Sequence, residues 1–130
     1  MKYLGIDYGS KWIGIAISDE QGKIAFPRAD VPNDEGILQF VARMVEQERI
    51  EKIVIGDTRT WGGGANPVTP GVESFAIELA RVTAIPSEFA REAGSSIEAS
   101  HYAPKGEEHN NAAAAAIILQ RYLEMHAAKM

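Results

Sequence analysis

The sequence predicts an α/β protein built around a mixed five-stranded sheet. Residues 2–31 contain β-prone apolar runs separated by turn signals, which is typical of an antiparallel meander. The rest of the chain alternates helical periodicity with short apolar runs, which is typical of βα units that extend a sheet with parallel strands. A length of 130 residues suits a single domain over residues 1–130.

Three consecutive strands are expected first, over residues 2–8, 12–19 and 23–31. The pairs Gly9-Ser10 and Gln21-Gly22 supply the turns between them. Pro27 interrupts the third run. Because proline cannot donate a ladder hydrogen bond, this strand is predicted to lie at an edge of the sheet.

The pattern then changes to helical periodicity. Asn33 or Asp34 can cap a helix that runs to about Arg49. One face of this helix is apolar and is expected to point inward: Ile37, Leu38, Val41, Met44 and Val45. The short apolar run at residues 51–57 follows and predicts a buried parallel strand.

The segment at residues 58–69 is rich in glycine and proline and is expected to be irregular. An irregular segment of this length favours a functional role over a linker. A second helix should follow, with Thr69 as its cap and Pro70 as its first residue. The remaining expected elements are a strand over 86–92, a short helix over 95–103 capped by Ser95, and a final helix over 111–129.

These elements predict the strand order 3-2-1-4-5, with the first three strands antiparallel and helices on both faces. This is the ribonuclease H-like arrangement. Asp7, Asp57 and Glu92 each end a strand, and the carboxyl ends of such strands gather at one edge. Oxygen ligands without His or Cys suit Mg²⁺ or Mn²⁺, and a pair of such ions suits phosphodiester hydrolysis.

Asp7 is the strongest of these candidates. An ionised carboxylate in an apolar strand is costly unless something compensates its charge, and a metal ion would do so. The alternative is that Asp7 caps the turn at Gly9-Ser10. Asp57 is equally open to two interpretations, as a metal ligand or as a cap of the glycine-rich segment.

Composition bounds the function. The formal net charge of -5 disfavours tight nonspecific binding of nucleic acid, although it leaves room for a nuclease with a local basic edge. The chain has no cysteine, no run long enough for a membrane span and no apparent signal peptide. We therefore expect a cytoplasmic protein with no membrane partner, either a monomer or a homodimer.

Four stretches resemble a known family in the same order along nearly the whole chain. They are GIDYGSKWIGIAISD, KIVIGD, IPSEFAREAGSSIEA and NNAAAAAIILQRYL. They resemble the YqgF family of pre-16S rRNA nucleases, also described as Holliday junction resolvase-like. The resemblance implies a ribonuclease H-like fold and a metal-dependent nuclease that matures precursor ribosomal RNA, with branched DNA as a minor alternative substrate. It implies catalytic, metal-binding positions at Asp7, Glu92 and residue 111.

This sequence departs from the family at two positions. Asn111 stands where the family usually has an aspartate, which implies reduced activity because an amide brings no charge. Asp57 stands where the family tends to have no acid, and it is a candidate fourth metal ligand. Asn111 and the net charge also favour an alternative function, a noncatalytic relative that binds nucleic acid or a protein partner.

Five further residues are candidates for contact with nucleic acid. Lys11 follows Gly9-Ser10 within the first motif and can pair with a phosphate, or it can be an exposed turn lysine. Arg59 and Trp61 offer a cation and a stacking surface, which suits single-stranded nucleic acid, unless Trp61 folds onto the core. The resemblance implies a hydroxyl pair at Ser95 and Ser96.

Overall fold

The structure is a computed structural model that describes residues 1–9, 11–56, 71–90 and 111–128. The elements follow in the order β1 (Tyr3–Asp7), β2 (Trp12–Ser18), β3 (Ala25–Pro32), α1 (Ile37–Glu48), β4 (Lys52–Gly56), α2 (Val72–Thr83), β5 (Ser87–Phe89) and α4 (Asn111–Ala128). The described helices include none that is both long and apolar enough to cross a bilayer.

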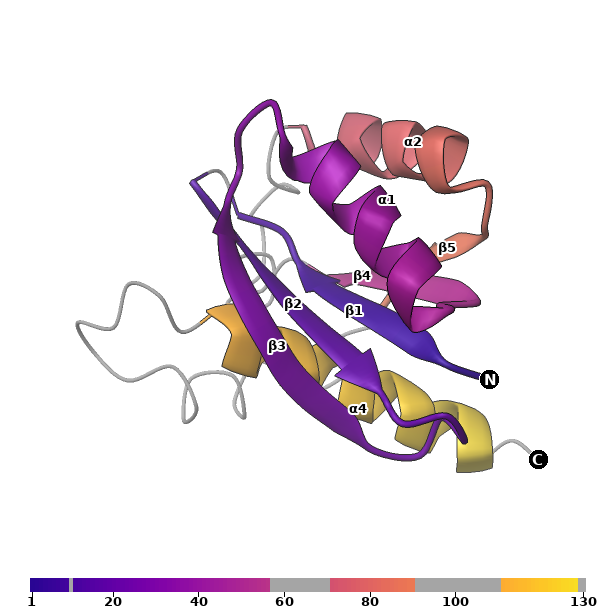
Figure 1. Cartoon of the computed structure of the whole chain (residues 1–130). Helices are drawn as coiled ribbons and strands as arrows, with labels where there is room; N and C mark the ends of the chain where they lie inside the picture. Colours follow the sequence, from indigo (N-terminus) through magenta and orange to yellow (C-terminus); the bar gives the residue numbers. More distant parts are fainter. Residues whose placement is uncertain (10, 57–70, 91–110, 129–130) are drawn as a thin grey trace, which may run out of the picture.

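The sheet has the order β3-β2-β1-β4-β5, as predicted. β1, β2 and β3 pair in antiparallel fashion, whereas β4 pairs in parallel with both β1 and β5. Helices α1 and α2 cover one face, and α4 covers the other (Figure 1). The predicted fold class is therefore confirmed.

The face toward α1 and α2 holds the larger core. Alternate strand residues point to it, and they are branched or long: Leu4, Ile6, Ile13, Ile15, Ile53 and Ile55, all fully buried. The inward residues predicted for the first helix, including Val41 of α1, pack against them, as does Leu79 of α2. Burying these side chains is the main apolar contribution to stability on this face.

The face toward α4 is lined by small residues. Gly5, Gly14, Ala16 and Gly56 alternate with the large residues of the other face. A methyl group on Gly5 would lie 2.8 Å from Cβ of Leu119, so the helix backbone approaches the sheet closely. The alanine-rich sequence of α4 is therefore matched to a strand surface without bulk.

Helix α1 corrects one sequence prediction. Its N-cap is Gly36, and neither Asn33 nor Asp34 caps it through a side chain. The carboxylate of Asp34 instead accepts a hydrogen bond from the Gly36 N–H at 2.9 Å, which makes a turn before the helix. The side chain of Asn33 donates instead to the carbonyl of Gly9 at 2.8 Å. Both polar residues serve connections outside the helix.

Helix α2 begins at Val72 after Gly71, which has φ 95°. The predicted cap Thr69 and first residue Pro70 lie outside the described residues, as do the irregular segment 58–69 and the short helix expected at 95–103. Strand β5 is shorter than predicted, with three residues. Its carboxylate Glu88 accepts hydrogen bonds from Tyr122 of α4 at 2.8 Å and pairs with Lys52 of β4 at 2.7 Å.

This contact raises the pKa of Lys52 above its ordinary value, because the hydrogen bonds with Glu88 and Tyr122 favour the ammonium form. The contact of Glu88 with Lys52 and Tyr122 ties strands β4 and β5 to α4.

A second link joins α4 to the edge strand β3. The Gln120 side chain accepts from the Ala25 N–H at 2.9 Å and donates to the Lys23 carbonyl at 3.0 Å.

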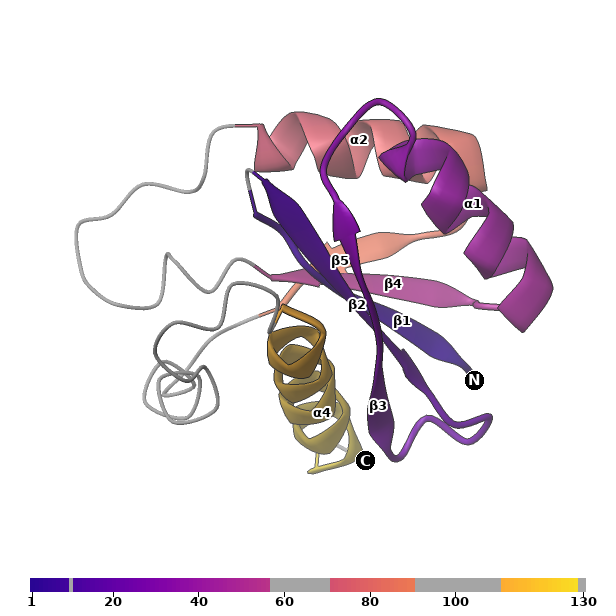
Figure 2. The ribbon, with the colours of Figure 1, turned by 60° about the vertical axis from the view of Figure 1, so that its left-hand side comes forward.

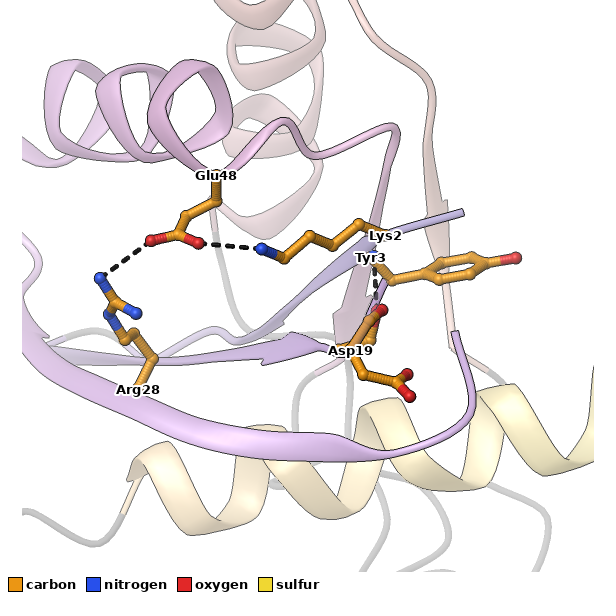
Figure 3. Close-up of polar contacts among 6 residues, drawn as sticks. Lys2, Tyr3, Asp19, Arg28 and Glu48 are labelled. Atoms are coloured by element: carbon orange, nitrogen blue, oxygen red, sulfur yellow. Dashed lines mark hydrogen bonds and ion pairs between the residues drawn. The ribbon is translucent and has the colours of Figure 1, made fainter. Parts of the chain in front are cut away.

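The last turn of α1 is tied to the sheet by Glu48. Its carboxylate pairs with Lys2 at 3.0 Å and with Arg28 of β3 at 3.1 Å (Figure 3). The hydrogen bond from Lys2, with a smaller contribution from Arg28, lowers the pKa of the Glu48 carboxyl from its ordinary value of 4.5. A carboxyl with a depressed pKa stabilises the folded state above its unfolded-state pKa and loses that contribution as the pH falls through the folded-state pKa.

The substitution Glu48→Gln tests this link. We expect the free energy of unfolding to be lower than in the parent at neutral pH. The difference should shrink as the pH falls below about 4.5, where the carboxyl is protonated in the unfolded state, and it should vanish once the pH is below the depressed pKa of the folded state. Urea unfolding between pH 7 and pH 3 measures it. Glu46→Gln, an exposed position on the same helix, is the matched control. A difference that stays constant down to pH 3 would contradict the ion-pair account.

Candidate active site

Asp7 is the last residue of β1 and is 4% exposed. Strand side chains alternate, so Asp7 shares the face of Gly5, toward α4, whereas Leu4 and Ile6 point into the other core. Its paired neighbours in the sheet are Gly14 on β2 and Gly56 on β4. The carboxylate therefore stands in a row of the sheet where neither adjacent strand contributes a side chain.

The chain that follows Asp7 is held on both sides. The N–H of Tyr8 donates to the Gly56 carbonyl at 2.8 Å, and the Tyr8 ring packs on Phe75 of α2 with centroids 5.0 Å apart. Asn33 bonds Gly9 through its side chain, and its N–H donates to the carbonyl of Lys11 at 2.9 Å. This arrangement fixes the turn between β1 and β2.

Gly9 is required in that turn because a Cβ there would collide with the backbone carbonyl of Trp12. The side chain of Lys11 is exposed beside the turn, which is compatible with either of its predicted roles. Ser10 lies outside the described residues, so the alternative that Asp7 caps the Gly9-Ser10 turn stays a hypothesis.

Asn111 is the first residue of α4, and it lies over the row that contains Asp7. A methyl group placed on Gly14 would overlap the carbonyl group of Asn111. Because Gly14 pairs with Asp7, the first turn of α4 lies next to the end of β1. Figure 2 shows α4 starting at the end of the sheet where β4 finishes. Two of the sequence-predicted positions, Asp7 and Asn111, are thus brought to one end of the sheet.

The other candidates lie outside the described residues: Asp57, Arg59, Trp61, Glu92, Ser95 and Ser96. Within the ranges that the structure describes, no three His, Cys, Asp or Glu side chains gather closely enough to hold a metal ion. The described donors near the site are oxygens, a carboxylate at Asp7 and an amide at Asn111, and these suit a hard divalent cation. A complete metal centre requires a further acid, and Glu92 remains the predicted one.

Two residues near this end of the sheet were missed by sequence reasoning. The sequence pattern predicts Asn33 as a possible helix cap, but its side chain holds the turn after Asp7. The pattern of residues 23–31 predicts only an edge strand there, yet Oδ1 of Asp30 accepts a hydrogen bond from the Ala112 N–H at 2.5 Å. The sequence does show an acid, Asp30, on the strand expected to pair with the strand that contains Gly14. Only the pairing register shows that Asp30 lies opposite Gly14.

The described fold is that of known resolvases. It matches the structure of Thermus thermophilus RuvC with a TM-score of 0.61 and 16% identity, and the match covers 98% of this chain and 97% of the other. It also matches the fowlpox virus Holliday junction resolvase with a TM-score of 0.53 and 14% identity, over 96% of this chain and 99% of the other. At these identities the similarity establishes the ribonuclease H-like fold.

Sequence comparison is more specific. Residues 1–125 match the family model described as RuvX, Holliday junction resolvase. A relative from Nitratidesulfovibrio vulgaris is 41% identical over 76% of this chain and 71% of its own. One from Dictyoglomus thermophilum is 32% identical over 95% of this chain and 96% of its own. Both carry the name "Putative pre-16S rRNA nuclease". The chain belongs to this RuvX family, and its resemblance to the YqgF nucleases is confirmed.

The packing of α4 over Gly14 gives a test that needs no substrate. Gly14→Ala should lower the free energy of unfolding by about 1–3 kcal/mol, because the new methyl group meets the backbone of Asn111, which cannot rotate away. Gly56→Ala is the matched control in the same row of the sheet. There the methyl group meets the far end of the Ile118 side chain, 2.8 Å away, which can move.

Chemical denaturation of the two variants measures this difference. The larger loss is expected for Gly14→Ala. Equal losses, or a larger loss for Gly56→Ala, would contradict the close placement of Asn111 over β2.

Proposed function

We propose that this chain is a metal-dependent nuclease that hydrolyses phosphodiester bonds in structured RNA, with the precursor of 16S ribosomal RNA as its substrate. The observation that carries the proposal is the burial of Asp7 at the end of β1, beside the first turn of α4, in a chain of this family. A carboxylate that is only 4% exposed at the end of a core strand is a suitable ligand for a divalent ion, whose charge would favour the ionised form.

Asp7, Glu92 and Asn111 would hold Mg²⁺ or Mn²⁺, with Asp57 as a further ligand. When bound, the ions supply charge stabilisation for the attacking and leaving oxygens of the phosphodiester. The chain's own residues orient the ions and the substrate. We propose that Lys11, which is exposed beside the turn, pairs with a backbone phosphate, and that Arg59 and Trp61 contact an unpaired strand.

Asn111 favours one second candidate, a relative that binds nucleic acid or a protein partner without turning it over. The first turn of α4 contains no acidic residue. An amide there provides one neutral oxygen, whereas holding two divalent ions benefits from negative charge. The two candidates differ in what restoring the acid would do.

Cleavage rates of three proteins decide between them. With Mg²⁺ or Mn²⁺ we expect slow cleavage of structured RNA by the parent and faster, more metal-dependent cleavage by Asn111→Asp. Adding Asp7→Asn to that variant should abolish the activity. A four-way DNA junction assayed in parallel tests the minor alternative of a Holliday junction resolvase.

Asp19→Asn is the matched control, because it makes the same chemical change in the β2–β3 hairpin, where an amide oxygen can still accept from Lys23. Equal rates in all variants would show that any cleavage comes from a contaminant, and they would favour the noncatalytic binding function. Faster cleavage of the junction than of RNA would move the substrate class to branched DNA.

Contact with unpaired bases is tested at Trp61. If a base stacks on its indole, Trp61→Ala should weaken binding of single-stranded RNA by about 1–3 kcal/mol and leave the melting temperature nearly unchanged. Fluorescence anisotropy with a labelled RNA and thermal unfolding measure the two quantities. A large fall in melting temperature with unchanged RNA affinity would show that Trp61 belongs to the core.

A further inference from the structure

Asp30 of β3 lies in the same row of the sheet as Asp7. It pairs with Gly14, which in turn pairs with Asp7. Directly paired residues point to the same face of a sheet, so both acids face α4. Gly14 between them has no side chain, and the carbonyl group of Asn111 occupies the space above it. The first turn of α4 is therefore seated between two carboxylates from different strands.

The contact of Asp30 with α4 is direct. Its Oδ1 accepts the N–H of Ala112 at 2.5 Å, and the residue is half-buried. The first N–H groups of a helix have no partner within the helix, and they carry partial positive charge. A carboxylate suits both conditions. Because α4 has no acid in its own first turn, β3 supplies this one.

We propose that Asp30 is a positioning residue for the site: it fixes the first turn of α4, and with it Asn111, relative to Asp7. This inference rests on the proposed function in assigning a use to that placement. Asp30 acts together with Gly14, which sets how closely the turn approaches the sheet, while the hydrogen bond sets where along β3 the turn is held. Without the carboxylate, the end of α4 loses its anchor at the position that faces Asp7.

The chain offers a matched control at the other end of the same contact. Gln120 also joins α4 to β3, through Ala25 and Lys23, eight residues beyond Ala112. Eight helical residues span about 12 Å, so Gln120 is distant from the first turn. Both Asp30→Ala and Gln120→Ala remove bonds between α4 and β3. Only Asp30→Ala removes a hydrogen bond next to Asn111.

The experiment compares the parent, Asp30→Ala, Asp30→Asn and Gln120→Ala by nuclear magnetic resonance. The first readout is hydrogen exchange of the Ala112 N–H. The second is the position of the Asn111 side-chain amide signals. The third is the affinity for Mn²⁺, followed by paramagnetic broadening of those signals. Asp30→Asn keeps an oxygen that can accept the hydrogen bond and serves as the conservative rescue.

We expect Asp30→Ala to speed exchange at Ala112 about tenfold or more, to shift the Asn111 side-chain signals, and to weaken Mn²⁺ binding about tenfold, as loss of a residue that orients a ligand does. Asp30→Asn should recover most of each effect. Gln120→Ala should lower the melting temperature while leaving all three readouts at parent values.

Unchanged exchange at Ala112 and unchanged Asn111 signals in Asp30→Ala would overturn the proposal. A loss of Mn²⁺ affinity no larger in Asp30→Ala than in Gln120→Ala would overturn it as well, because the effect would then be general destabilisation. If the parent binds no Mn²⁺ and Asn111→Asp cleaves nothing, the proposed function fails. In that case the Ala112 and Asn111 signals still decide whether Asp30 holds the first turn.

Discussion

The close packing of α4 against the sheet is the contact on which the rest of the candidate site depends. It is possible because the sheet presents glycine or alanine at Gly5, Gly14 and Ala16 where α4 crosses it, while most of the branched strand residues point to the opposite face. The two faces of the sheet thus differ. The face toward α1 and α2 carries branched side chains, and the face toward α4 carries small residues where the helix crosses. A helix that approaches this closely brings its first turn onto the row of Asp7. The site is therefore a consequence of packing as much as of the acids themselves.

The same contact explains how a buried carboxylate is tolerated. Asp7 is the last residue of its strand, and its paired neighbours Gly14 and Gly56 place no side chain beside it. The start of α4 adds the partial positive charge of a helix N-terminus nearby. Charge at this end of the sheet is thus distributed over elements that are far apart in sequence. It depends on β1, β3 and α4 being held together, and the bonds of Asp30 and Gln120 join two of these elements, β3 and α4.

Sequence patterns predicted the strand order and most element positions, because periodicity and turn chemistry are local signals. They also placed Asn111 at the start of the last helix. They failed at Asp30, and the reason is a β-bulge. Ala16 pairs with Pro27 but Ile15 pairs with Ala29, so β3 contains one extra residue. Counting back from the hairpin without the bulge would pair Asp30 with Ile13 and turn it toward the apolar core. The cap of α1 failed for a related reason: Asn33 has a partner in a distant turn that no local pattern reveals.

The edge formed by β3 also bears on how copies of this protein meet. An edge strand with free backbone groups is a template for another chain, and sheets can grow from it. Here Pro27 and Pro32 lack the N–H that a further strand would need, and the bulge between them increases the local twist. The charged Arg28 is exposed between them. The irregular pairing that aligns Asp30 with α4 therefore also makes this edge of the sheet a poor template for a further strand.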